Sequence, residues 1–261
     1  MSNTDMKEII KVRREVMKEQ DTENITSDQA LGLPQPSIAN EKKSDMVIEL
    51  PNSYESVVVN NNFMEVLNNR TSKRKYSEEI ISLLELAYLL WSTQGVKKVI
   101  GKERKATMRT VASAGARHPF ETYLFVNRVE GLKPGLYHYL ALEHKLEYLG
   151  EVKDQTAKVT EAFGDQEFFA TAPVGFVWTV VPYRSEWRYT VNAQKYALLD
   201  AGHVCQNLYL AAESIGCGAC AIGAYEQDLA DKLLGLSSEP TSEKENEFVV
   251  YAASVGKLPN E

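Results

Sequence analysis

Residues 110–121 read TVASAGARHPFE and place Ser113 and His118 on either side of Gly115. A serine served by a histidine could attack a carbonyl group, whereas small residues beside basic side chains could let the backbone lie against a flat anionic ligand. The nucleophile elbow of serine hydrolases has a glycine two residues before the serine, and this chain has Val111 there. The pattern therefore favours a ligand-binding loop over a catalytic serine.

A second chemical signal is the segment NRTSKRKY, in which Arg70, Ser72 and Arg74 occupy alternate positions. Alternate side chains of an extended segment point to the same side, so two guanidinium groups and a hydroxyl would converge on one point. Guanidinium groups match the geometry of phosphate oxygens, and the segment therefore indicates a phosphate-binding site. A solvated basic linker would have the same composition, and it stays open as the alternative.

A third segment, CAIGAYE, supplies small residues from Ala221 through Ile222 and Gly223 to Ala224. A loop of this kind can point its backbone N–H groups at a ligand. A tight connection between two helices would have the same sequence. The three segments are more informative together than any of them is alone.

Two further motifs contain residue types that could bind a dinucleotide or a zinc ion, but their structural context does not fit either ligand. GCGACA at residues 216–221 fits the pattern of dinucleotide-binding folds, but that motif must follow a strand and open a helix, and here it follows a helix. His203, Cys205, Cys217 and Cys220 resemble zinc ligands. On a helix, however, His203 and Cys205 point roughly 200° apart and cannot share one ion. We interpret the cysteines as buried and reduced.

The elements that must position these segments are a mixture of strands and helices. Helical spacing predicts one helix over residues 61–70 and a second that has Ser77 as its N-cap and runs to Gly95. Apolar runs rich in β-branched and aromatic residues, with a Pro-Gly turn at residues 134–135, predict strands. The predicted strands are Thr122–Asn127, Leu136–Leu140, Lys145–Leu149, Val174–Val180 and Phe248–Val255.

The most regular element is KYALLDAGHVCQNLYLAAESIG, residues 195–216, whose apolar residues recur at alternating intervals. Gly216 ends the predicted helix. Leu198, Leu199 and Leu210 place apolar side chains on its other faces, which predicts a helix buried on most sides at the centre of the fold. Strands alternating with long helices, without regular βαβ spacing, indicate an α+β class.

Composition limits the classes of function. The chain has 261 residues, 44% of them apolar, and a formal charge of −7, which argues against nucleic-acid binding. No apolar run is long enough to span a membrane, and the charged N-terminus lacks the apolar stretch of a signal peptide, so we expect a cytoplasmic protein. We divide the chain into an extension, residues 1–60, with a helix around Lys7–Gln20 and an extended arm, and a domain, residues 61–261.

The motifs in their order and spacing carry a family resemblance. R-x-S-x-R-x-Y at residues 70–76, S-A-G at 113–115 and a helix ending in GCGACAIGA resemble the nitroreductase family of FMN enzymes over about residues 61–257. SAGARHPFE, GLKPGLYHY and KYALLDAGHVCQN are similar to the SagB-type branch, the azoline dehydrogenases of thiazole and oxazole peptide maturation. The resemblance implies a central mixed or antiparallel sheet flanked by helices, and a homodimer with FMN at the interface beside the long helix.

The same resemblance implies roles for the binding segments. Arg70, Ser72 and Arg74 would hold the phosphate and the pyrimidine edge of FMN. Gly223 would offer its N–H to flavin N5, with Ala221, Ile222 and Ala224 around it. Lys257 is a further candidate for the phosphate, where many members of the family have a Lys/Arg pair.

The small-residue loop would line the cofactor from the partner subunit. Its residues are Ser113, Ala114, Gly115, Ala116 and His118. Members of the wider family often have Asn and Gln where this chain has Ala116 and His118. The side-chain contacts at that edge of the flavin are therefore not implied by the resemblance.

The chemistry implied by the SagB-type branch is a two-electron oxidation of azolines to azoles. It requires a base near the carbon that loses a proton, and Lys195 and Tyr196 stand where this branch carries a Lys-Tyr pair. A solvent-exposed lysine beside a packed tyrosine is the structural alternative. The other functions left open are an NAD(P)H-dependent reductase of nitro compounds, quinones or flavins, and a flavin-free scaffold or peptide-binding partner. A cyclodehydratase is a possible partner of the dehydrogenase.

Overall fold

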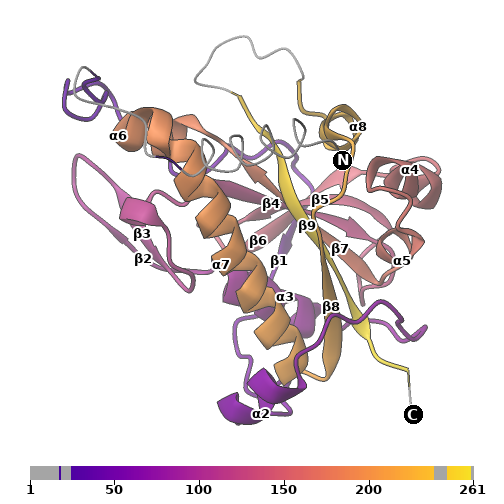
Figure 1. Cartoon of the computed structure of the whole chain (residues 1–261). Helices are drawn as coiled ribbons and strands as arrows, with labels where there is room; N and C mark the ends of the chain where they lie inside the picture. The colour runs from indigo at the N-terminus through magenta and orange to yellow at the C-terminus, as the bar shows by residue number, and fades with distance from the viewer. Residues whose placement is uncertain (1–17, 19–24, 238–245, 260–261) are drawn as a thin grey trace, which may run out of the picture.

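The computed structural model describes residues 18, 25–237 and 246–259. Its centre is a seven-stranded antiparallel sheet with the strand order β1-β6-β5-β4-β7-β9-β8 (Figure 1). The hairpin of β2 and β3 stands apart from this sheet. The strands are β1 Val47–Glu49, β2 Val96–Ile100, β3 Ala106–Arg109, β4 Phe120–Val126, β5 Gly135–Leu140, β6 Lys145–Gly150, β7 Val174–Val180, β8 Cys217–Ile222 and β9 Phe248–Lys257.

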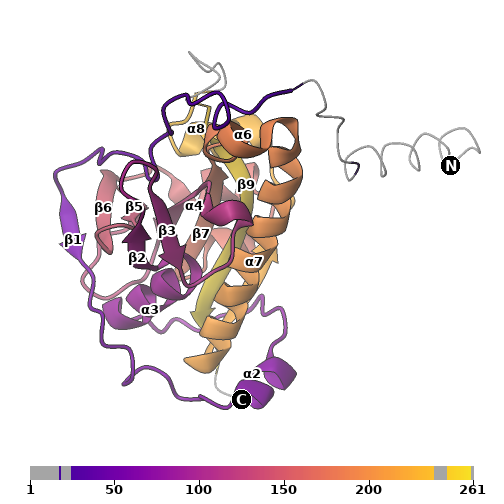
Figure 2. The ribbon, with the colours of Figure 1, turned by 90° about the vertical axis from the view of Figure 1, so that its left-hand side faces the viewer.

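Helices cover both faces of the sheet, as Figures 1 and 2 show. Apolar residues of α3 and α7 form one core cluster with the sheet, and those of α4, α5 and α8 form a second cluster. Every residue of β4 and β7 is buried as a result. The helices are α2 Phe63–Asn69, α3 Leu83–Gln94, α4 Gln155–Ala162, α5 Glu167–Ala170, α6 Tyr183–Tyr189, α7 Ala193–Ser214 and α8 Gln227–Leu233, with 3₁₀ turns η1 Ala114–Ala116 and η2 Thr190–Asn192.

The predicted α+β class and the antiparallel sheet flanked by helices are confirmed. All five predicted strands are present: Val174–Val180 has the predicted bounds, and the other four differ only at their ends. The short helix predicted over residues 61–70 is α2, whose N-cap is Asn62. Across the described ranges, no helix is both long enough and apolar enough to pass through a bilayer.

The long helix α7 is present, and Gly216 follows its end with a left-handed φ of 68°. Val204 and Leu208 are buried on the side that packs against the sheet. The prediction that the helix is buried on most sides was wrong for a single subunit, because Leu198 is 55% exposed and Leu199 is 48% exposed. Helix α7 therefore has more apolar surface than its own chain covers.

The predicted N-cap at Ser77 was wrong. Helix α3 begins five residues later than that position implies, and its N-cap is Ser82. The Ser82 hydroxyl accepts the Glu85 N–H while the Glu85 carboxylate accepts the Ser82 N–H, so this capping box satisfies two otherwise unpaired donors. Ile81 meanwhile forms an isolated bridge with Val129, which holds the preceding residues in an extended conformation.

The small-residue segment after α7 was predicted as a loop, but Cys217–Ile222 form strand β8. The segment pairs with β9 in antiparallel register, for example Gly218 with Gly256. Its residues have weak strand preference, so this pairing and not intrinsic propensity decides the conformation. Small residues are required here because a Cβ on Gly218 would lie 2.6 Å from side-chain atoms of Lys73 and Leu258.

The extension contributes to the main sheet. Strand β1 pairs with β6, and the arm before it passes over two buried carboxylates, those of Glu121 and Glu147. The Asn40 N–H donates to Glu121 at 2.7 Å, and the Lys43 and Ser44 N–H groups donate to Glu147 at 2.7 Å each. The helix predicted around Lys7–Gln20 lies outside the described residues, apart from Lys18.

A buried histidine lies between the same two carboxylates. His138 is 1% exposed, and its ring nitrogens lie 3.1 Å from Glu121 and 2.7 Å from Glu147. Burial alone would lower the pKa of His138, but hydrogen bonds to the two carboxylates and their charges outweigh it and raise the pKa to about 9. The Arg184 guanidinium pairs with Glu121 from the other side at 2.5 Å. The arm is thus attached to the sheet by buried charges.

Candidate functional site

The segment with Arg70, Ser72 and Arg74 runs along the outer edge of β8. Helix α2 packs beside the C-terminal end of α7 and leads directly into Arg70 (Figure 2). Ser72 forms a parallel bridge with Ala219, and the Lys73 N–H donates to the Ala219 carbonyl at 2.9 Å. The segment is therefore held extended by the sheet rather than left as a free linker.

Both arginines of this segment rest on aromatic rings. The Arg70 guanidinium lies 5.3 Å from the centre of the Tyr209 ring, and that of Arg74 lies 5.9 Å from the centre of the Phe168 ring. Within the described part of the chain, neither guanidinium forms an ion pair with a carboxylate. Two cations and the Ser72 hydroxyl are thus available as donors to a phosphate group.

Tyr209, which sequence reasoning did not single out, joins two of the predicted segments. Its hydroxyl lies 3.0 Å from Ser72 Oγ and accepts the Ala221 N–H at 2.7 Å. A tyrosine in the last part of an amphipathic helix looks like a core residue, so no sequence pattern indicates this role. The structure brings the basic segment and the end of β8 together through this one hydroxyl.

The predicted third segment lies at that strand end. Ala221 and Ile222 are the last residues of β8, and the Ile222 side chain is buried. Gly223 and Ala224 follow the strand and are exposed. The nearest atom to a Cβ placed on Gly223 would be 4.0 Å away, so there is room for a ligand to approach its backbone.

Lys257 is the last residue of β9, and its ammonium group forms an ion pair with Glu85. Glu85 belongs to the capping box of α3, so this carboxylate has several partners. The charge of Lys257 is therefore compensated within the chain. A contact between Lys257 and a phosphate stays a prediction.

The loop at residues 113–118 contains the 3₁₀ turn η1 and unusual backbone angles. Gly115, Ala116 and His118 have φ values of 56°, 54° and 43°. Such left-handed angles are disfavoured for residues with a Cβ and persist only where surrounding contacts hold them. The His118 N–H donates to Ser113 Oγ at 2.9 Å, which closes the loop on itself.

The two basic side chains of this loop face the interior of their own subunit. His118 is 4% exposed, and burial together with the charge of Arg109 lowers the pKa of His118 to about 3, so its ring is neutral at physiological pH. Arg117 is 6% exposed and lies over the Trp187 ring at 5.0 Å. The loop therefore presents its small residues, and not its basic ones, at the surface.

Lys195 and Tyr196 lie in the first turn of α7, on the same side of the molecule as this loop. The Tyr196 ring packs edge-on against Tyr189, with ring centres 4.8 Å apart. The Tyr189 hydroxyl in turn comes so close to Gly115 that a Cβ there would lie 2.4 Å from it. Tyr189, also missed from the sequence, thus connects the predicted catalytic pair to the loop.

The two groups of residues lie at different places on α7. Asp200 accepts the Ala114 N–H, so the loop lies beside α7 at Asp200. The hydroxyl of Tyr209 contacts Ser72, so the Arg70–Arg74 segment lies beside α7 at Tyr209. Nine helical residues separate Asp200 from Tyr209, which corresponds to roughly 13 Å along the axis and about 180° around it. One subunit therefore presents the loop and the basic segment on opposite sides of the helix.

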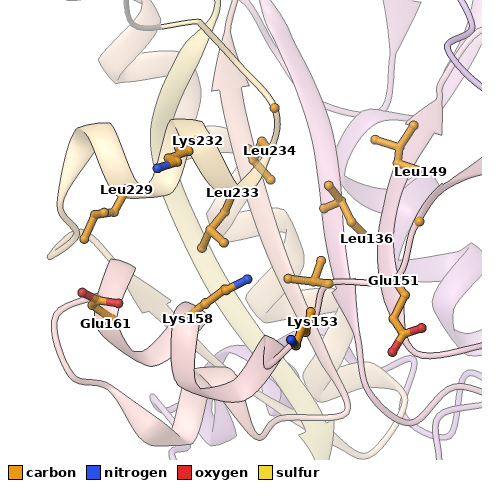
Figure 3. A pocket seen from close by; sticks show the side chains of 13 residues that line it. Leu136, Leu149, Glu151, Lys153, Lys158, Glu161, Leu229, Lys232, Leu233 and Leu234 are labelled. Carbon is orange, nitrogen blue, oxygen red and sulfur yellow. The ribbon is translucent and has the colours of Figure 1, made fainter.

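A cavity of about 750 Å³ lies elsewhere, between α4, α8 and the ends of β5 and β6 (Figure 3). Its floor is apolar, with Leu136, Leu149 and Leu233, and Lys153 and Lys158 stand at its rim. None of the predicted site residues lines it. It is therefore separate from the site built above.

The three cysteines are buried and unpaired with one another. Burial raises the pKa of Cys205 and that of Cys217 to about 12, so neither thiol ionises near neutral pH. In the part of the chain that the structure describes, no cluster of His, Cys, Asp and Glu side chains could hold a metal ion. The interpretation of these cysteines as buried and reduced agrees with the structure.

Comparisons with known proteins point in one direction. Residues 67–257 match the nitroreductase family. MJ1384 of Methanocaldococcus jannaschii is a protein provisionally named as a nitroreductase. It is 30% identical to this chain over 67% of this chain and 85% of its own length. The trifolitoxin-processing protein TfxB of Rhizobium leguminosarum is 29% identical over 61% of this chain, and the match spans only 43% of that protein.

A solved structure shares the fold over almost the whole chain. It is the Escherichia coli microcin synthetase McbBCD complex with truncated pro-MccB17 bound. The TM-score is 0.57 at 16% identity, and the match covers 99% of this chain and 95% of the compared one.

Proposed function

This chain belongs to the nitroreductase family of oxidoreductases, and on that premise we propose that it is an FMN-dependent enzyme that works as a homodimer. The observation that carries the proposal is the pair Arg70 and Arg74, which rest on aromatic rings without acidic partners among the described residues. With the Ser72 hydroxyl beside them, they form the donor set that a phosphate ester requires. FMN would supply a two-electron acceptor that amino-acid side chains lack.

The residues around the strand end fit the remainder of the cofactor. Arg70 and Arg74 would balance negative charge at the phosphate and the pyrimidine edge. Gly223 would direct its N–H toward flavin N5, since it is exposed and no atom crowds it. Tyr209 would fix the distance between these donors through its two hydrogen bonds.

A second copy of the chain would complete the site. The small-residue loop and the basic segment lie on opposite sides of α7, so they cannot both contact one cofactor within a subunit. A two-fold arrangement across α7 would bring the loop of one subunit to the basic segment of the other. Leu198 and Leu199 supply the exposed apolar surface that such an interface would bury.

For the reaction we propose azoline oxidation in a peptide, as in the SagB-type branch. The hydride equivalent would pass from one ring carbon to FMN, and the adjacent carbon must lose a proton. Lys195 would accept that proton, and Tyr196, held against Tyr189, would orient or relay it. The electrons would then pass from FMN to an acceptor such as oxygen. The relationship to TfxB, a toxin-processing protein, supports this choice.

The named relatives support a partner protein and a second candidate reaction. The structural neighbour is a multiprotein synthetase complex with its precursor peptide bound, which supports a cyclodehydratase partner for this chain. The 30% identity to MJ1384 instead supports an NAD(P)H-dependent reductase of nitro compounds, quinones or flavins as the second candidate. An open flavin face would be sufficient for such a reductase.

The proposal is tested in two stages. First, the protein is purified and its absorption spectrum recorded before and after reconstitution with FMN; a colourless protein that takes up no FMN would favour a flavin-free scaffold. Second, the flavin-loaded protein is given a thiazoline-containing peptide in air, and separately NAD(P)H with a quinone. Formation of the thiazole, two mass units lighter, supports the dehydrogenase, and quinone reduction alone supports the reductase.

A further inference from the structure

Asp200 is an acidic residue within the buried part of α7. It is 4% exposed, although its helical neighbours Ala197, Ala201 and Val204 are apolar. A carboxylate is rarely buried without partners that compensate its lost hydration. The groups that contact Asp200 therefore indicate its role.

Those contacts all lead to the small-residue loop. Both Asp200 carboxylate oxygens lie 3.1 Å from the Ala114 nitrogen and accept its N–H. The Ser113 hydroxyl lies near the same carboxylate and favours its charged form, and the Ser113 oxygen accepts the His118 N–H at 2.9 Å. His203 approaches at 3.9 Å, but its side chain is 55% exposed. Asp200 of α7 thus holds the start of the loop through Ala114, and Ser113 joins that start to the far end of the loop at His118.

The loop needs such an attachment. Ala116 and His118 adopt left-handed backbone angles, which are disfavoured for residues with a Cβ and persist only when neighbouring contacts enforce them. The turn at Ala114–Ala116 is short and lies at the surface of the subunit. Without Asp200, the Ala114 N–H would have no acceptor among the described residues.

We propose that Asp200 is a positioning residue, which holds the Ser113–His118 loop in the shape that lines the flavin of the partner subunit. This role rests on the proposed FMN-dependent function. Asp200 acts through the loop backbone and does not touch the cofactor itself. It also links the loop to the helix that carries Lys195 and Tyr196, so both are set by one rigid element.

The test uses Asp200→Ala, Asp200→Asn and Ser113→Ala in the full chain. Asp231→Ala is the matched control, because Asp231 is also a buried carboxylate that accepts a backbone N–H, from Val249 at 2.7 Å, but it lies away from the loop. Amide hydrogen exchange of the FMN-free protein reports the loop directly, and fluorescence titration reports FMN affinity.

Asp200→Ala is expected to speed exchange at residues 114–118 at least tenfold and to weaken FMN binding about tenfold, the scale of one or two lost hydrogen bonds. Asp200→Asn keeps one acceptor and should recover part of both effects. Combining Asp200→Ala with Ser113→Ala should change both measurements by less than the sum of the two single changes, because Asp200 and Ser113 hold the same short loop. Asp231→Ala should leave both measurements at the wild-type value.

Unchanged loop exchange and FMN affinity in Asp200→Ala would overturn the positioning role while leaving the flavin assignment intact. Equal effects in Asp200→Ala and Asp231→Ala would also overturn it, since they would show general destabilisation. A wild-type protein that binds no FMN would overturn the proposed function and, with it, this role.

Discussion

The hydroxyl of Tyr209 lies 2.7 Å from the backbone nitrogen of Ala221, and the same oxygen lies 3.0 Å from Ser72 Oγ. Tyr209→Phe removes both hydrogen bonds and keeps the ring under Arg70. We expect FMN affinity to fall about five- to tenfold, which corresponds to roughly 1 kcal/mol.

Fluorescence titration with FMN measures this effect, and Tyr88→Phe is the control. The Tyr88 hydroxyl makes a comparable bond, at 3.0 Å to Ser214 Oγ, near the same end of α7. Tyr88→Phe should lower the free energy of unfolding about as much as Tyr209→Phe does and should leave FMN affinity unchanged. Equal affinity in the two variants would show that Tyr209 has no special role in the site.

Arg70→Ala combined with Arg74→Ala tests the phosphate assignment. Each guanidinium is expected to supply a charge-assisted hydrogen bond, so their joint loss should weaken FMN binding roughly a hundredfold or more. Lys97→Ala with Lys98→Ala removes the same charge from exposed positions of β2 and should bind FMN normally. Full FMN occupancy in the arginine double variant would reject the assignment.

Lys195→Ala and Tyr196→Phe separate chemistry from cofactor binding. Both variants should retain FMN and should be reduced by dithionite at the wild-type rate, because neither step needs a protein base. Oxidation of a thiazoline peptide should be lost in both, since Lys195→Ala removes the acceptor of the ring proton and Tyr196→Phe removes the hydroxyl that orients or relays it. Mass spectrometry of the peptide checks this, and native-rate oxidation by both variants would make the pair structural.

His138 predicts how stability depends on pH. Its pKa is about 9 in the folded protein and 6.5 in an unperturbed chain, so the proton is held more tightly in the folded state. The stabilisation is complete below about pH 6.5 and is lost as the pH rises through 9, and the difference corresponds to about 3 kcal/mol.

Urea unfolding of wild type and His138→Gln at pH 6, 7.5 and 9 measures this effect. The difference in the free energy of unfolding between the two proteins should shrink as the pH rises. His203→Gln is the control, because His203 is 55% exposed on its side-chain surface and should show no such trend. A constant difference across the range would mean that His138 is neutral in the folded protein.

The strands that the sequence predicted are those in which apolar and aromatic side chains decide the conformation. Val174–Val180 was predicted with the bounds it has, because its residues both prefer strands and are buried on each face. Cys217–Ile222 was missed, since its small residues carry no such preference and its ladder with β9 depends on partners 30 to 40 residues away. The start of α3 was misplaced because Ser77 was predicted as the N-cap, although Ser82 with Glu85 three residues later fits a capping box. The bridge of Ile81 with Val129 also holds the preceding residues extended.

The role of Arg70, Ser72 and Arg74 in phosphate binding stays a prediction, but their position together in one extended segment was predictable, because charge and spacing carry that information. Tyr209 and Tyr189 were not, because a hydroxyl that joins two distant segments leaves no local pattern. His118 shows a second limit: its residue type indicated a basic ligand contact, but its ring is buried within its own subunit. Asp200 is different, because a carboxylate among the apolar residues of a regular helix is visible in the sequence. That pattern indicates a buried acidic residue.

The surplus of apolar surface on α7 has a thermodynamic consequence. If Leu198 and Leu199 are covered only when two subunits associate, each subunit gains part of its folding free energy from the other. The melting temperature should then rise with protein concentration, and dilution should cost the enzyme its stability together with its active site. A single helix would in this way make the lifetime of the folded chain a function of how much of it the cell contains.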